Sequence, residues 1–137
     1  MRVFSTSAVG MASAVVLAGL SGAALAEVPK EVSSIDGAKV TLYVQPFLDE
    51  AELATLRLVA TQSQALKLFV PTEKGYAAIA LSPDDGFIKA GVPAPSASAV
   101  AEMPDAATAS LKALEMCNAA RKGPSDCVIV MEISPPN

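Results

Sequence analysis

Two cysteines, Cys117 and Cys127, constrain this chain more than any other feature. They are the only cysteines in 137 residues, and they stand ten positions apart. Cys117 falls in the last turns of an expected helix, Gly123 and Pro124 interrupt that helix, and Cys127 opens an expected strand. The chain also begins with a signal-peptide pattern, described below, and an exported protein that has exactly two cysteines usually pairs them. We therefore expect one disulfide that ties the helix end to the strand.

Two other interpretations of the cysteines are a pair of buried thiols and a redox-active dithiol. The second lacks a Cys-x-x-Cys spacing, and Cys117 lies far from the helix N-terminus that would lower the pKa of a thiol. The spacing therefore favours a structural bond.

The N-terminus has the three parts of a signal peptide. Arg2 supplies the positive charge, Ala12 to Leu20 form a short apolar core, and Ala24-Leu25-Ala26 gives a small-x-small cleavage site. An uncleaved anchor is the alternative, but a span takes about 20 predominantly apolar residues, and small polar residues interrupt this run. We expect cleavage after residue 26, a periplasmic or secreted location, and no stable membrane anchor after cleavage.

Composition narrows the possible chemistry. The chain carries a net charge of −4 and no histidine. Nucleic-acid binding needs clustered Lys and Arg, so no nucleic-acid partner is expected. Without histidine the chain lacks the commonest general base and the commonest nitrogen ligand for metals. It also lacks a glycine-rich phosphate loop and a Gly-x-Ser-x-Gly elbow, and we expect no cofactor and no metal.

The periodicity of apolar residues predicts six elements. Alternation predicts strands over residues 39–44, 76–82, 87–91 and 127–133, and helical spacing predicts helices over 49–64 and 105–122. Asp49 and Asp105 are the candidate N-caps. The order is that of an α+β, ferredoxin-like split βαβ fold (βαββαβ), which has an antiparallel sheet with two helices on one face.

The same pattern divides the chain into four parts. Residues 1–26 form the cleaved leader, 27–38 an N-terminal arm, 39–134 a single α+β domain and 135–137 a tail. Within the domain, residues 92–104 are rich in Pro, Ala and Ser, and we expect them to run over the surface.

With both helices on one face, the other face of the sheet would be open. Contiguous apolar patches of this kind mark interaction sites. The alternatives are cover by the N-terminal arm or by the Pro-rich segment, homodimerisation, and binding of a ligand. The candidate interaction face consists of Tyr43, Tyr76, Ala78, Ala80, Val128 and Val130.

Three function hypotheses follow. The first is a non-catalytic, disulfide-stabilised periplasmic or secreted domain that binds a protein partner or forms a homodimer. The second is a periplasmic carrier of a small molecule. The third is an enzyme in which carboxylates such as Asp84 and Asp85 would do all the proton work, although Pro83-Asp84-Asp85-Gly86 is complete as a turn.

Three segments resemble a group of small exported proteobacterial proteins of unknown function, namely FLDEAELATLRLVA, GYAAIALSPDDG and ALEMCNAARKGPSDCVIVMEISP. Some members carry the label 5-aminolevulinic acid synthase. That activity implies pyridoxal phosphate, a large fold with a Schiff-base lysine, and a phosphate cup, whereas this chain has 137 residues and no such cup. Residues 77–133 also resemble the helix–Cys–Cys–strand core of a secreted bacterial domain of unknown function.

Overall fold

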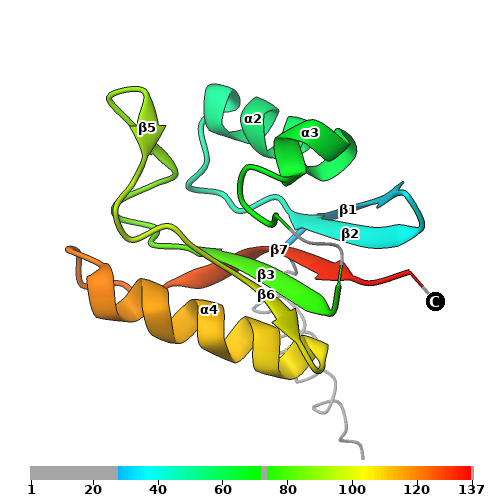
Figure 1. The fold of residues 1–137 in the computed structure, drawn as a ribbon. Helices are drawn as coiled ribbons and strands as arrows, with labels where there is room; N and C mark the ends of the chain where they lie inside the picture. The colour runs from blue at the N-terminus through cyan, green and yellow to red at the C-terminus, as the bar shows by residue number, and fades with distance from the viewer. Residues whose placement is uncertain (1–27, 72–73, 137) are drawn as a thin grey trace, which may run out of the picture.

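The structure, a computed structural model, describes residues 28–71 and 74–136. In these residues a five-stranded sheet has the strand order β1-β2-β7-β3-β6, and every neighbouring pair is antiparallel (Figure 1). The sheet strands are β1 (Lys30–Ile35), β2 (Ala38–Tyr43), β3 (Tyr76–Leu81), β6 (Ser98–Met103) and β7 (Val128–Ser134). The remaining elements are α2 (Glu50–Thr61), α3 (Ser63–Leu66), α4 (Ala106–Ala120) and a two-stranded ribbon of β4 (Ile88–Lys89) and β5 (Val92–Pro93).

Both predicted N-caps are confirmed. The side chain of Asp49 accepts a hydrogen bond from the Glu52 amide, and Glu52 accepts one from the Asp49 amide, which completes a capping box at the start of α2. Asp105 accepts a hydrogen bond from the Thr108 amide at 2.7 Å. These bonds satisfy amide groups that the first turn of a helix leaves without a partner.

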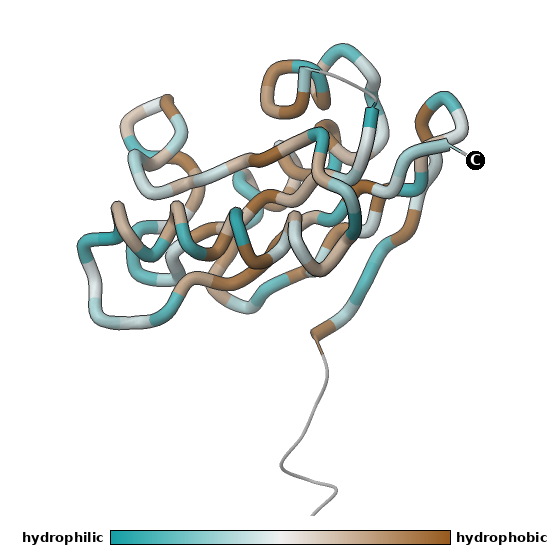
Figure 2. The backbone as a smooth tube through the Cα atoms, turned by 60° about the horizontal axis from the view of Figure 1, so that its bottom comes forward, coloured by the Kyte–Doolittle hydropathy of each residue, from teal (hydrophilic) through white to brown (hydrophobic). Residues whose placement is uncertain are grey.

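The α+β class and the antiparallel sheet are confirmed, but the arrangement differs from the ferredoxin-like one. The helices lie on opposite faces of the sheet, with α2 and α3 on one side and α4 on the other (Figure 1). Figure 2 turns α4 to the front, where hydrophobic and hydrophilic residues alternate along the helix. The α2 face is built on large side chains such as Leu42, Leu56 and Ile79, and the α4 face on small ones such as Ala78, Ala80 and Ala113. Small residues on both partners let α4 lie close to the sheet.

The expected N-terminal arm is instead largely a sheet strand. β1 pairs with β2 from Lys30↔Tyr43 to Ile35↔Ala38. Asp36 and Gly37 connect them and both have positive φ, 51° and 88°. A two-residue loop with this backbone twists in the sense that an antiparallel hairpin requires, and Asp-Gly is its preferred sequence.

The strand beside β3 is also not the expected one. β6, from the segment expected to run over the surface, pairs with β3, whereas residues 88–89 pair only with β5. The ribbon turns at Ala90 and Gly91, both with positive φ. Because β4 is only two residues long and its ribbon leaves the sheet, β6 takes the place beside β3 that the sequence pattern assigned to residues 87–91.

The leader prediction concerns residues 1–26, which lie outside the described residues. In the described part of the chain no helix is long and apolar enough to cross a membrane. Of the predicted tail, Pro135 and Pro136 follow the end of β7.

Candidate functional site

The predicted interaction face does not form one open surface. Ala78 and Ala80 are fully buried under α4, and Tyr76 packs against the same cluster. Val128 pairs with Leu81, and Val130 is fully buried in the core on the α2 side.

A bulge explains the change of face along β7. Ile79 pairs with Met131 and Ala80 pairs with Ile129, so Val130 has no opposite residue in β3. An extra residue of this kind reverses the alternation of side chains beyond it. Ile129 therefore faces α4 whereas Met131 faces α2, although strict alternation along the predicted strand 127–133 would place them on one face. Among the six predicted residues, only Tyr43 lies on the α4 side in the part of the sheet that α4 leaves uncovered.

The disulfide is confirmed. Cys117 and Cys127 are bonded with their Cα atoms 6.1 Å apart, and both residues are buried. The amide of Cys127 donates a hydrogen bond to Oδ1 of Asn118, which closes the same junction from the helix side. The bond therefore fixes the end of α4 to the start of β7.

The Asp84-Asp85 turn also holds that junction. Asp84 accepts hydrogen bonds from the amide and hydroxyl of Ser125, and Asp85 accepts them from the Ser96 hydroxyl at 2.6 Å and from the Lys122 amide. The Ser96 hydroxyl, followed by the Lys122 amide, holds the pKa of Asp85 below its usual range. Because neighbouring loops occupy both carboxylates, their geometry is that of a structural turn.

A buried carboxylate connects α2 to the ribbon. Glu52 is 7% exposed, and its Oε2 accepts hydrogen bonds from the amides of Phe87 at 2.7 Å and Ile88 at 2.9 Å. A Cβ on Gly86 would lie 3.0 Å from the same oxygen. This contact positions the start of the ribbon relative to α2.

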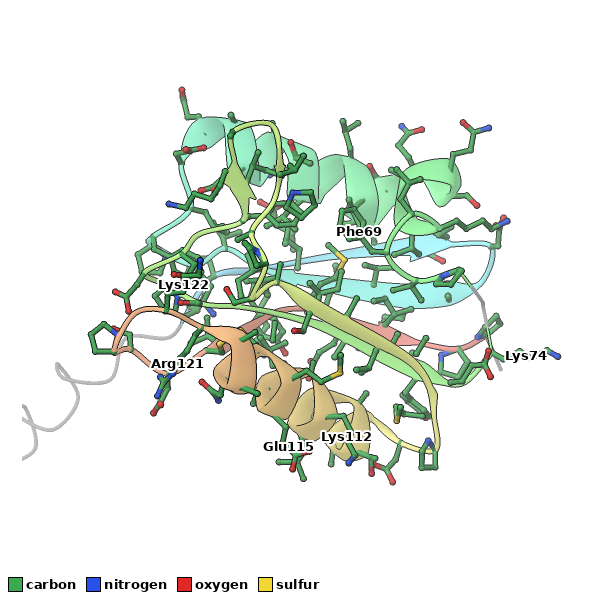
Figure 3. The ribbon with its side chains drawn as sticks, turned by 60° about the vertical axis from the view of Figure 1, so that its left-hand side comes forward. Phe69, Lys74, Lys112, Glu115, Arg121 and Lys122 are labelled. Atoms are coloured by element: carbon green, nitrogen blue, oxygen red, sulfur yellow. A yellow bond between two sulfur atoms is a disulfide. The ribbon has the colours of Figure 1, made fainter. Side chains whose placement is uncertain are left out.

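An apolar groove lies between α2 and the ribbon. Its main hollow has a volume of about 460 Å³, and a smaller hollow of about 240 Å³ beside it shares Leu68, Phe69 and Pro93. Figure 3 shows Phe69 between the α2–α3 layer and the sheet. We call the main hollow the apolar groove; its lining is Thr55, Leu58, Val59, Ala65, Leu68, Phe69, Ile88 and Pro93.

The rim of the apolar groove exposes large apolar side chains. Leu68 is 81% exposed and Leu58 is 54% exposed. The floor is fixed, since Phe69 contacts the fully buried Phe87 with ring centroids 5.7 Å apart. Sequence reasoning missed this site, although Leu58 was a signal, because it is apolar and lies off the buried stripe of α2.

A separate hollow of 360 Å³, which contains charged side chains, lies on the part of the sheet that α4 leaves uncovered. We call it the Tyr43 hollow. Tyr43 donates a hydrogen bond from its hydroxyl to Oε1 of Glu132 at 2.5 Å, and Ser110 of α4 donates one to Oε2 at 3.0 Å. The ammonium of Lys30 lies 5.6 Å from the centre of the Tyr43 ring. The hollow is lined by Val28, Lys30, Tyr43, Gln45, Ile129 and Glu132.

Glu132 keeps the Tyr43 phenol protonated. The hydrogen bond to Glu132, followed by burial and by repulsion from the same carboxylate, raises the pKa of Tyr43 from 10.0 to about 12. The contribution of this pair to stability is therefore complete below pH 10. It is lost as the pH rises from 10 to about 12, because in that range the Tyr43 phenol has already lost its proton in the unfolded state but still holds it in the folded state.

Replacing Glu132 by glutamine is expected to lower the pKa of Tyr43 toward 10, because the charge that opposes phenolate formation is removed. Phenolate absorbance followed against pH measures this, and Tyr43→Phe identifies which of the two tyrosines titrates last. A last titration step that is unchanged in Glu132→Gln would contradict the hydrogen bond.

Within residues 28–71 and 74–136 no group of three or more metal-binding side chains is placed to hold an ion. No family model, no curated protein and no solved structure matches this chain.

Proposed function

We propose that this chain is an exported, non-catalytic binding domain that receives apolar side chains of a partner protein in the apolar groove. The observation that carries this proposal is the exposed pair Leu58 and Leu68 on the rim of a groove whose lining has no charged side chain. Exposed apolar surface around a hollow is typical of interaction sites. The signal-peptide pattern and the Cys117–Cys127 disulfide support a periplasmic or secreted location.

The open rim favours a protein over a small molecule. A small-molecule site buries roughly 70–90% of its ligand. Here Leu68 projects into solvent and offers its surface to a partner that covers the rim as well as the floor. A second copy of this chain is one such partner, and light scattering on the mature protein distinguishes a dimer from a monomer.

A carrier of small molecules is the second candidate. The main hollow of 460 Å³ falls in the range of about 300–1,000 Å³ that ligand sites occupy. Bound apolar material that co-purifies with the protein and appears in native mass spectrometry would favour this function.

Peptide panning on the mature protein tests the proposal. We expect selected peptides to carry neighbouring Leu, Ile or Phe residues. Their affinity should fall roughly tenfold or more in Leu68→Ser, because the contact of a buried leucine is worth about 1.5–3 kcal/mol.

Leu111→Ser is the matched control, since Leu111 is 59% exposed but lies on α4, on the other side of the sheet. Peptides that bind Leu68→Ser and Leu111→Ser equally well would reject the apolar groove as the binding site.

A further inference from the structure

The Tyr43 hollow brings one negative and one positive side chain to a single aromatic ring. Glu132 lies at the hydroxyl end of Tyr43, and the Lys30 ammonium lies over the ring. Four elements supply this arrangement: Lys30 lies in β1, Tyr43 in β2, Glu132 in β7 and Ser110 in α4. The hollow is therefore a product of the tertiary fold.

The negative charge of Glu132 is held but not neutralised. Its two oxygens accept hydrogen bonds from hydroxyl groups only, those of Tyr43 and Ser110. In the part of the chain that the structure describes, no basic side chain forms a salt bridge with Glu132. Two neutral donors orient a carboxylate and leave its charge available to a cationic group, which forms stronger hydrogen bonds than a neutral one.

The positive charge of Lys30 is likewise uncompensated by a carboxylate in the described residues. Its described interaction is with the face of Tyr43, and a cation–π contact at an exposed site is weak. An anionic group that enters the hollow can therefore recruit this ammonium at small cost.

From these two charges we infer that the Tyr43 hollow binds a small zwitterion of the amino-acid class, with its ammonium on Glu132 and its carboxylate on Lys30. Ile129 and Val28 in the lining receive the apolar side chain of the ligand. The volume of 360 Å³ lies within the range of small-ligand sites, about 300–1,000 Å³. A ligand with only one of the two charges gains one ionic contact and meets a like charge at the other end.

Amide chemical-shift titration of the labelled mature protein tests the inference with three probes. L-norleucine carries both charges, n-pentylamine lacks the carboxylate, and hexanoate lacks the ammonium. We expect saturable shifts at Tyr43, Ile129 and Glu132 with L-norleucine, and binding of the other two weaker by roughly tenfold or more, the loss of one charged hydrogen bond. No saturable shift with L-norleucine, or equal binding of all three probes, would overturn the inference.

Variants connect the shifts to the two charges. Glu132→Gln and Lys30→Gln should each weaken L-norleucine binding by roughly tenfold, the same charged-hydrogen-bond contribution. Lys30 is exposed, so its variant is readable even if Glu132→Gln does not fold. Glu115→Gln is the control, because Figure 3 shows Glu115 on the side of α4 turned away from the sheet, where it pairs with Lys112. Undiminished binding in Lys30→Gln would reject the site, as would an equal loss in Glu115→Gln.

Discussion

Replacing Ala80 by aspartate is expected to remove a large part of the stability of the fold. Ala80 has no exposed surface, and it packs in the cluster that α4 forms with β3 through Ala109, Ala113 and Cys117. None of these neighbours offers a cationic partner. A carboxylate left there without a partner costs about 3–5 kcal/mol, which is a large share of the roughly 5–15 kcal/mol that stabilises an ordinary domain.

Urea denaturation followed by circular dichroism measures this loss, and Val32→Asp is the control. Val32 lies on the same face of the sheet, because it pairs with Thr41 and Thr41 pairs with Glu132, but it is on β1 and 61% exposed. We expect its denaturation midpoint to change little. If Ala80→Asp were as stable as Val32→Asp, α4 could not cover β3 as the structure has it.

Local signals predicted most elements of this fold. The caps at Asp49 and Asp105, the alternation in β2 and the Gly123-Pro124 stop all act within a few residues, so the sequence carries them directly. The Asp36-Gly37 hairpin is a local signal of the same kind, and it was missed because the residues before it are polar. β1 is polar because it is an edge strand that leaves one face exposed to solvent.

The layer arrangement could not be predicted in the same way. The face of the sheet on which α4 packs is set by the Ala-rich strand β3. Both faces of β3 are apolar, since Ala77, Ala78, Ile79 and Ala80 are all buried. A strand buried on both faces shows no alternation that would assign a helix to either side. The bulge at Val130 added a second error, since one unpaired residue moves Met131 to the other face.

The candidate sites were hidden for a related reason. Glu132 and Tyr43 are 89 residues apart in the chain and meet only because β7 inserts between β2 and β3. The apolar groove depends on a ribbon that the sequence placed inside the sheet. Two residues depart from the pattern around them and could have indicated the sites. Leu58 is apolar but lies off the buried stripe of α2, and Glu132 is charged in an otherwise apolar strand. Leu58 lines the apolar groove and Glu132 lines the Tyr43 hollow.

The disulfide lies at the junction of α4 and β7, beside the Asp84-Asp85 turn. It joins the end of α4 to the start of β7, while the Asp84-Asp85 turn fixes the loop between them. An added Cβ at Gly123 would lie 2.3 Å from the Cβ of Asp84, so turn and loop are in close contact. The bond therefore helps to keep α4 on the face that contains Ala78 and Ala80.

Removing the bond with Cys117→Ala and Cys127→Ala is expected to lower the free energy of unfolding by about 3 kcal/mol. The closed loop spans a sequence separation of 10, and the chain-entropy model gives about this value for a loop of that size. Urea denaturation of the oxidised protein, the reduced protein and the double variant measures it. The last two should agree, because both lack the cross-link. A reduced protein as stable as the oxidised one would show that packing alone holds α4 against β3, and that the cross-link contributes nothing to the fold.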